Sequence, residues 1–244
     1  MKDIKAVLSS QITELKTNKI QMIFFAAWIV ITIAFPLILN SGLGAPEYWS
    51  YPRQAAPAVG VAVAGGFIVL LFSVITANHY DKGLLKSLTP VSYILGMALF
   101  YSVIIVIMAI FGAIIGTLTG VAMLNYTMIL LVSMLCAMFI GGIIGLLSRS
   151  IDRALMVGIP TGAILGGIFI KARDGVYAFS LIDQIRPFIR WFYAERINNM
   201  LIEVRSGDFM IDVAVMLINA IALAVLFILI YRVKIKQSCN YYQN

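Results

Sequence analysis

Charged residues, cysteine and histidine are all scarce in this chain. Of its 244 residues only 12% are charged, two are cysteines and one is a histidine. The single histidine excludes a histidine pair or a His-Glu-x-x-His zinc site, and two cysteines give no disulfide framework. Apolar residues make up 61% of the chain, so a soluble domain of this length would have nowhere to place its apolar surface. The composition therefore indicates a membrane protein.

Several catalytic motifs are also missing. The chain has no Gly-x-x-x-x-Gly-Lys-Ser/Thr loop for nucleotide phosphates, no Gly-x-Ser-x-Gly nucleophile turn and no adjacent glutamates within an apolar run. Asp212, at the start of the last apolar run, is the one carboxylate placed where an ion path could use it, although such a residue commonly reaches the interface. We therefore expect no enzyme activity in this chain and no cofactor or metal of its own.

Long apolar runs dominate what remains. A helix needs about 20 residues to cross about 30 Å of hydrocarbon, and period-2 alternation typical of barrel strands is absent from the runs. The sequence predicts a single all-α transmembrane domain over 1–244, with six spans at about 20–39, 55–77, 93–120, 127–147, 154–171 and 210–231.

The charges predict the orientation of these spans. With six spans, the side that holds both termini carries 11 Lys or Arg against 4 Asp or Glu, a balance of +7, whereas the other side carries 7 against 7. The positive-inside rule makes the basic side cytoplasmic, so we expect a multi-pass protein of the bacterial cell membrane with both termini inside. The lysines are spread over short loops beside apolar runs, which favours lipid head groups over nucleic acid as their partner.

Two segments outside the spans are amphipathic. Residues 1–19 carry Ile4, Val7, Leu8, Ile12 and Leu15 at helical spacing, with lysines and Gln11 on the other face, which predicts a helix on the inner membrane surface. The outer segment 172–209 mixes apolar and charged residues, so we expect it to lie in the outer interface or to re-enter the membrane. Its candidate outer-gate residues are Arg186, Pro187, Phe188, Arg190, Trp191 and Phe192.

Glycines repeat every four residues in three of the spans. Such ladders let helix backbones approach closely, which predicts a tightly packed bundle with little internal aqueous space. The candidate packing residues are Gly112, Gly116, Gly120, Gly141, Gly145, Gly158, Gly162 and Gly166.

The segment 78–92, which we call the island, is a short charged stretch between the second and third spans. We expect one short helix outside the bilayer, limited by Pro90, whose leucines fill a groove on a partner protein. Lys82 and Lys86 lie four residues apart and share a face that can meet acidic residues or lipid phosphate. His79 is interpreted as a polar residue at the interface. The alternative is an ordinary cytoplasmic loop whose lysines serve only to orient the neighbouring spans in the membrane.

These features together resemble the membrane subunit of a type-2 ABC exporter, of the small kind associated with export of antimicrobial peptides, lantibiotics or drugs. The island carries Asp81-Lys82-Gly83, then Leu84, Leu85 and Leu88, then Pro90-Val91-Ser92; a glycine-rich fourth span ends at Ser148-Arg149; and an amphipathic outer segment precedes the last span. Where the family usually has Thr after the glycine of the island and Gly-Lys at the start of span three, this chain has Leu84 and Gly96-Met97.

The resemblance implies a function and a set of partners. The island would be the coupling helix that docks on an ATPase subunit, through Asp81, Lys82, Gly83, Leu84, Leu85, Lys86, Leu88 and Pro90. Two ATPase copies, which hold ATP and Mg²⁺, would assemble with this chain and a second permease chain, either identical or a close paralogue. The cargo would be an amphipathic peptide or a hydrophobic compound. The alternatives are an ATP-independent secondary carrier and an immunity protein that binds its toxin without transport.

Overall fold

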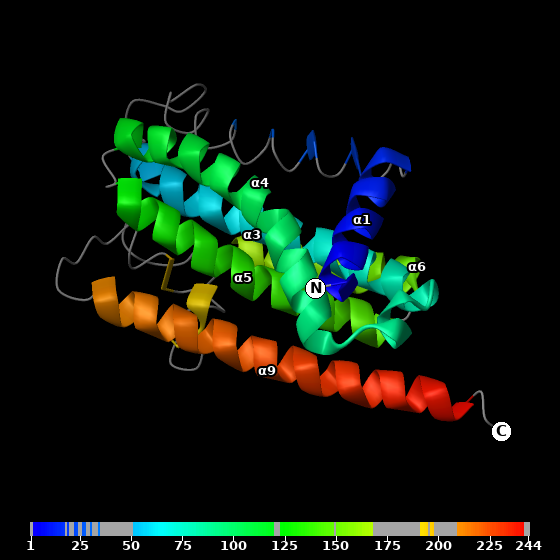
Figure 1. The fold of residues 1–244 in the computed structure, drawn as a ribbon. Coiled ribbons are helices and arrows are strands. Elements are labelled where there is room, and N and C mark those ends of the chain that lie inside the picture. The colour runs from blue at the N-terminus through cyan, green and yellow to red at the C-terminus, as the bar shows by residue number, and fades with distance from the viewer. Residues whose placement is uncertain are drawn as a thin grey trace.

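The computed structural model describes most of the chain as helix. The described residues are 2–17, 51–119, 123–148, 150–167, 191–194, 196–197 and 209–241, with isolated positions between 19 and 34. The elements are α1 (Lys2–Thr17), α3 (Tyr51–Asp81), the short 3-10 helix η1 (Leu84–Ser87), α4 (Pro90–Thr119), α5 (Met123–Ser148), α6 (Ile151–Gly167) and α9 (Phe209–Tyr241) (Figure 1). No strand occurs among these residues, as the all-α prediction requires.

Three of the described helices are long and apolar enough to cross a membrane. These segments are Gly60–Asp81, Asn125–Ser148 and Phe209–Ile235, in the places predicted for the second, fourth and sixth spans. Helices α4 and α6 occupy the positions predicted for the third and fifth spans. The predicted first span falls almost entirely outside the described residues. Long apolar helices of this kind indicate a membrane protein.

Two helix boundaries differ from prediction for local reasons. Helix α4 begins at Pro90 rather than 93, since proline suits the first helical turn, and the Thr89 hydroxyl accepts the Ser92 amide at 3.2 Å as a cap. Helix α9 continues to Tyr241, past the predicted end at 231. No glycine or proline occurs in its last turns, so the basic residues that follow the apolar run extend the same helix.

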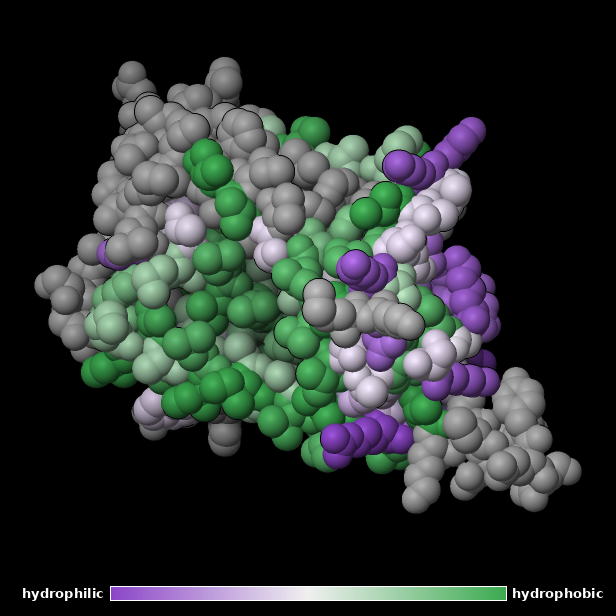
Figure 2. Space-filling view, in the orientation of Figure 1, coloured by the Kyte–Doolittle hydropathy of each residue, from purple (hydrophilic) through white to green (hydrophobic). Residues whose placement is uncertain are grey.

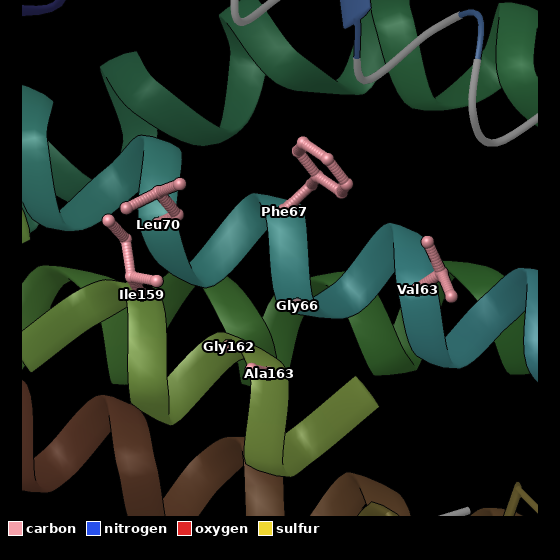
Figure 3. A pocket seen from close by; sticks show the side chains of 7 residues that line it. All are labelled: Val63, Gly66, Phe67, Leu70, Ile159, Gly162 and Ala163. Carbon is pink, nitrogen blue, oxygen red and sulfur yellow. The ribbon is translucent and has the colours of Figure 1, made fainter. Parts of the chain in front are cut away.

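Helix α3 lies at the centre of the bundle, where it packs against α5 and α6, and α9 runs along α5 (Figure 1). Glycines allow the close approach. A side-chain carbon added to Gly66 of α3 would lie 2.5 Å from the Gly162 carbonyl oxygen of α6 (Figure 3), and one added to Gly145 of α5 would lie 2.5 Å from the Ser73 carbonyl oxygen of α3. Gly141 likewise faces a carbonyl oxygen of α3, that of Val69, whereas Gly158 faces the Ser73 side chain. The surroundings of Gly112, Gly116, Gly120 and Gly166 lie outside the described part of the chain.

The surface of the molecule is divided along its length. Hydrophilic residues gather at the end where α1 and the island lie, and apolar residues cover the middle (Figure 2). Between α3 and α6 the apolar surface forms a groove of about 320 Å³, lined by Val63, Gly66, Phe67, Leu70, Ile159, Gly162 and Ala163 (Figure 3). Helix α9 is the most exposed of the three candidate spans: 28% of its most apolar stretch is buried, against 78% in α3 and in α5.

Candidate functional site

The island consists of three short pieces rather than the single helix predicted. It comprises the last turn of α3, the four residues of η1 and the first turn of α4. Gly83 separates the first two pieces with a left-handed backbone (φ 72°, ψ 4°). Its amide donates to the Tyr80 carbonyl at 3.0 Å and its own carbonyl accepts from Lys86 at 3.1 Å. Glycine adopts positive φ without steric cost, so Gly83 sets the direction in which η1 leaves α3.

The side of the island that faces the helix bundle is attached to α9. The Leu85 side chain is fully buried. The hydroxyl of Tyr231, on α9, lies 2.7 Å from the Leu85 carbonyl oxygen and 3.1 Å from the Leu88 carbonyl oxygen, and it donates to them. Leu84 and Leu88 are half-buried. The prediction that the leucines fill a groove on a partner therefore needs correction for Leu85, whose side chain completes the core of its own chain.

A buried chain of hydrogen bonds links α1, α3 and α4 beneath the island. His79 is fully buried; its Nε2 lies 2.8 Å from Gln11 Nε2 and its Nδ1 lies 3.0 Å from the Tyr93 hydroxyl. The Tyr93 hydroxyl is 3.3 Å from Thr76 Oγ1. His79 is thus buried within the protein, and partners from two other helices satisfy both ring nitrogens; its depth at the membrane interface stays a prediction.

Glu14 of α1 adds a charged connection to the same place. Its carboxylate accepts from Asn78 Nδ2 at 3.2 Å and from Lys82 Nζ at 3.1 Å, and lies 3.4 Å from His79 Nε2. Burial raises the pKa of Glu14, but hydrogen bonds and charge from His79 and Lys82 outweigh it and lower the pKa to about 2. Glu14 is therefore ionised at neutral pH, and it holds α1 against the end of α3.

Helix α1 docks through a stripe that the sequence pattern did not single out. Val7, Gln11 and Glu14 are buried at spacings of four and three, and Val7 fits against Gly96 of α4, where an added side-chain carbon would lie 2.6 Å from Val7 Cβ. Ile12, from the predicted apolar face, is 46% exposed. Polarity alone predicts that Gln11 is exposed, but the side chain is buried because it binds His79. The spacing of Val7, Gln11 and Glu14 was the available signal.

The side of the island that faces away from the helix bundle presents polar groups. Asp81, Lys82, Lys86, Ser87 and Thr89 are exposed, and Pro90 and Gly83 are half-buried. The Lys82 side chain is 56% exposed although its ammonium pairs with Glu14. A protein that binds here would meet this mixed-charge surface first, with Leu84 and Leu88 at its edge.

At the other end of the bundle, part of the outer segment is tied to α9. Arg196 Nη1 lies 2.7 Å from Asp212 Oδ1, and Asp212 is 3% exposed. Asn219 Nδ2 donates to the Trp191 carbonyl oxygen at 2.8 Å, and the Arg196 guanidinium lies 5.1 Å from the Trp191 ring centre. Asp212 is therefore held in an ion pair. Phe192 is half-buried.

The other candidate gate residues, Arg186, Pro187, Phe188 and Arg190, lie outside the described residues. Comparison of the chain with models of known families, with curated proteins and with solved structures found no match.

Proposed function

We propose that this chain is the membrane permease subunit of an ATP-driven exporter, and that a separate ATPase subunit docks on the island. The chain itself would perform no chemistry. Two ATPase copies would hold ATP and Mg²⁺, and a second permease chain, identical or closely related, would complete the complex. The cargo would be amphipathic or hydrophobic, such as an antimicrobial peptide, a peptide toxin or a drug, moved out of a bacterial cell membrane.

One observation carries this proposal. The side of the island that faces away from the helix bundle is exposed, and the side that faces the bundle is firmly attached to it. A docking element transmits force only if its displacement moves other helices. The Glu14 and Gln11 contacts attach the island to α1, and the Tyr231 contact attaches it to α9. A loop that served only to set the topology would not need buried polar contacts to two helices remote in sequence, α1 and α9.

The proposed cycle is a shift between two populations. Binding of ATP would bring the ATPase subunits together and displace the islands, and the helices attached to them would follow, which favours the outward-open form. The close helix contacts at Gly66 and Gly145 leave little room for a permanent aqueous path, which suits a cargo that enters from the membrane. The ion pair of Asp212 with Arg196 gives that carboxylate a structural role and weakens the case for an ion-coupled carrier.

Co-purification from native membranes tests the docking. In mild detergent, the wild-type chain is expected to bring an ATPase subunit with it, and Lys86→Glu is expected to lose most of it, because the substitution reverses an exposed charge on the island. Arg153→Glu is the matched control, since it reverses an exposed charge in the first turn of α6, outside the island.

Two other substitutions are less informative. Proline cannot adopt the positive φ of Gly83, so Gly83→Pro would change the local backbone. Lys82→Glu would replace the ion pair with Glu14 by a repulsion between two carboxylates. Both substitutions would therefore disturb the fold of the chain as well as its docking. Absence of any ATPase from the wild-type preparation would contradict the proposed function, as would equal recovery with Lys86→Glu.

A further inference from the structure

The inner end of α9 is locked to the island and to two neighbouring helices. Tyr231 is 1% exposed and donates its hydroxyl hydrogen bond to η1 and the residue that follows it. One turn earlier, the Phe227 ring lies 6.3 Å from the Tyr93 ring of α4, nearly parallel to it. Phe227 also fills the space at Gly142 of α5, where an added side-chain carbon would lie 2.7 Å from the ring. This end of α9 therefore cannot shift without moving the island or breaking these contacts.

The outer end of the same helix holds the described part of the outer segment. Asp212 pairs with Arg196, and two turns further on Asn219 binds the Trp191 backbone. Both contacts join residues 191–197 to one face of α9. A buried ion pair and a side-chain to backbone hydrogen bond are directional, so they fix the position of the segment along the helix.

Helix α9 is suited to carry displacement between these two ends. At about 1.5 Å per residue, Asp212 and Tyr231 lie about 28 Å apart along the axis, close to the thickness of the hydrocarbon layer. Phe209–Tyr241 is one continuous helix and contains no proline or glycine at which it would bend. Because most of its apolar stretch is exposed, close packing restrains α9 less than α3 or α5.

We propose that α9 mechanically couples the island to the outer segment, with Tyr231 as the residue that positions the island on it. Displacement of residues 84–88 at the inner face moves α9 through the Tyr231 hydroxyl, and α9 moves residues 191–197 through Asp212 and Asn219. The coupling is a property of this chain alone. Only its use in transport rests on the proposed function.

Hydrogen–deuterium exchange on the intact chain in nanodiscs, without any ATPase, tests the coupling. Tyr231→Phe keeps the ring and removes the hydroxyl. Loss of one net hydrogen bond should speed exchange in residues 84–88 about fivefold. Coupling should also speed exchange at residues 191–197, at the opposite face, by at least about twofold. The matched control is Tyr126→Phe, which removes the hydroxyl of another buried tyrosine, near the start of α5, and should leave exchange in residues 84–88 unchanged.

The reverse experiment uses Asn219→Ala, which removes the contact to Trp191 and spares the ion pair. Since coupling between two sites is reciprocal, exchange should rise both at 191–197 and at 84–88. A change confined to the segment next to either substitution would overturn the proposal, and so would no change in both variants. Because no ATPase is present, these outcomes are independent of whether an ATPase co-purifies with the chain.

Discussion

Polar side chains hold this apolar chain together at single, identifiable positions. His79, Glu14 and Tyr231 are each buried or nearly so, and each contacts a helix remote in sequence. A buried polar group is costly unless its hydrogen bonds are satisfied, and at these three positions partners are present. The specificity of the inner end of the bundle therefore rests on a few hydrogen bonds rather than on apolar packing alone.

The Glu14 contact predicts a dependence on pH. The folded-state pKa of Glu14, about 2, lies below its ordinary value of 4.5, so the stabilisation is complete above pH 4.5 and is lost as the pH falls towards 2. A nitroxide attached at Thr13→Cys, an exposed position on α1, should be immobile at pH 7 and become mobile over that interval. Glu14→Gln should weaken docking of α1 by about 2 kcal/mol and flatten the profile. An unchanged profile in Glu14→Gln would show that another group holds α1.

The glycine contacts predict opposite effects for two adjacent residues. Gly66→Ala should destabilise the chain by about 1–3 kcal/mol, because the new methyl group would meet the Gly162 carbonyl at 2.5 Å and force α3 from α6. Gly65→Ala is the control: its methyl group would lie 3.7 Å from Ser133 Oγ, an ordinary contact, and alanine favours helix. Thermal unfolding in detergent measures both. Equal melting temperatures for the two variants would contradict the packing described here.

At the scale of residues, the sequence pattern predicts well which positions lie close to another helix. It does not predict which residues of that helix they contact. Gly145 and Gly162 were identified from their four-residue spacing, whereas Gly66, which faces Gly162, belongs to no such ladder within α3. Spacing reports which residues share a face, and it does not report which helix that face meets. The partners of His79 escape prediction for the same reason, because both lie on other helices.

Among the elements, α1 buries one face and exposes another. One face docks on α3 and α4 through Val7, Gln11 and Glu14, while Ile12 on another face remains exposed. The sequence predicted an amphipathic helix here, and the structure has one over Lys2–Thr17. The prediction failed in assigning Gln11 to the exterior, since a buried polar network offers a polar side chain an alternative to water.

The ion pair at the start of α9 predicts a non-additive pair of substitutions. Asp212→Asn should leave Arg196 without its partner carboxylate and lower stability by about 3 kcal/mol, whereas Asp212→Leu with Arg196→Met should recover most of that loss. Unfolding of the single and double variants measures the difference. If folded Asp212→Asn abolished transport while retaining stability, the ion-coupled carrier would become the better interpretation.

For the whole molecule, the charge count and the structure address different parts of the topology. The count predicts both termini on the cytoplasmic side. In the structure α1 and the inner end of α9 both contact residues of the island, so they lie at one end of the bundle. Three candidate spans are identified in the described residues. The six-span arrangement stays a prediction, because the predicted first span lies outside these residues and α4 and α6 are not among the three.

Thiol labelling in sealed right-side-out vesicles tests this arrangement. In a background with Cys136 and Cys239 replaced, a membrane-impermeant reagent should label Ser206→Cys, in the predicted outer segment, before permeabilisation. Thr13→Cys on α1 should react only afterwards, as should the native Cys239 when it alone is retained. Labelling of Thr13→Cys in sealed vesicles would reverse the predicted orientation.

The contact between Tyr231 and Leu85 also has a consequence for the order of biosynthesis. The two residues are 146 positions apart in the chain. At about 5–20 residues per second, the ribosome adds Tyr231 about 7–30 s after Leu85. During that time the nascent island lacks its contact with Tyr231, so the packing around the island is complete only after α9 has been made. A ribosome-arrested chain ending before α9 should therefore expose residues 84–88 to protease, and release of the full-length chain should protect them.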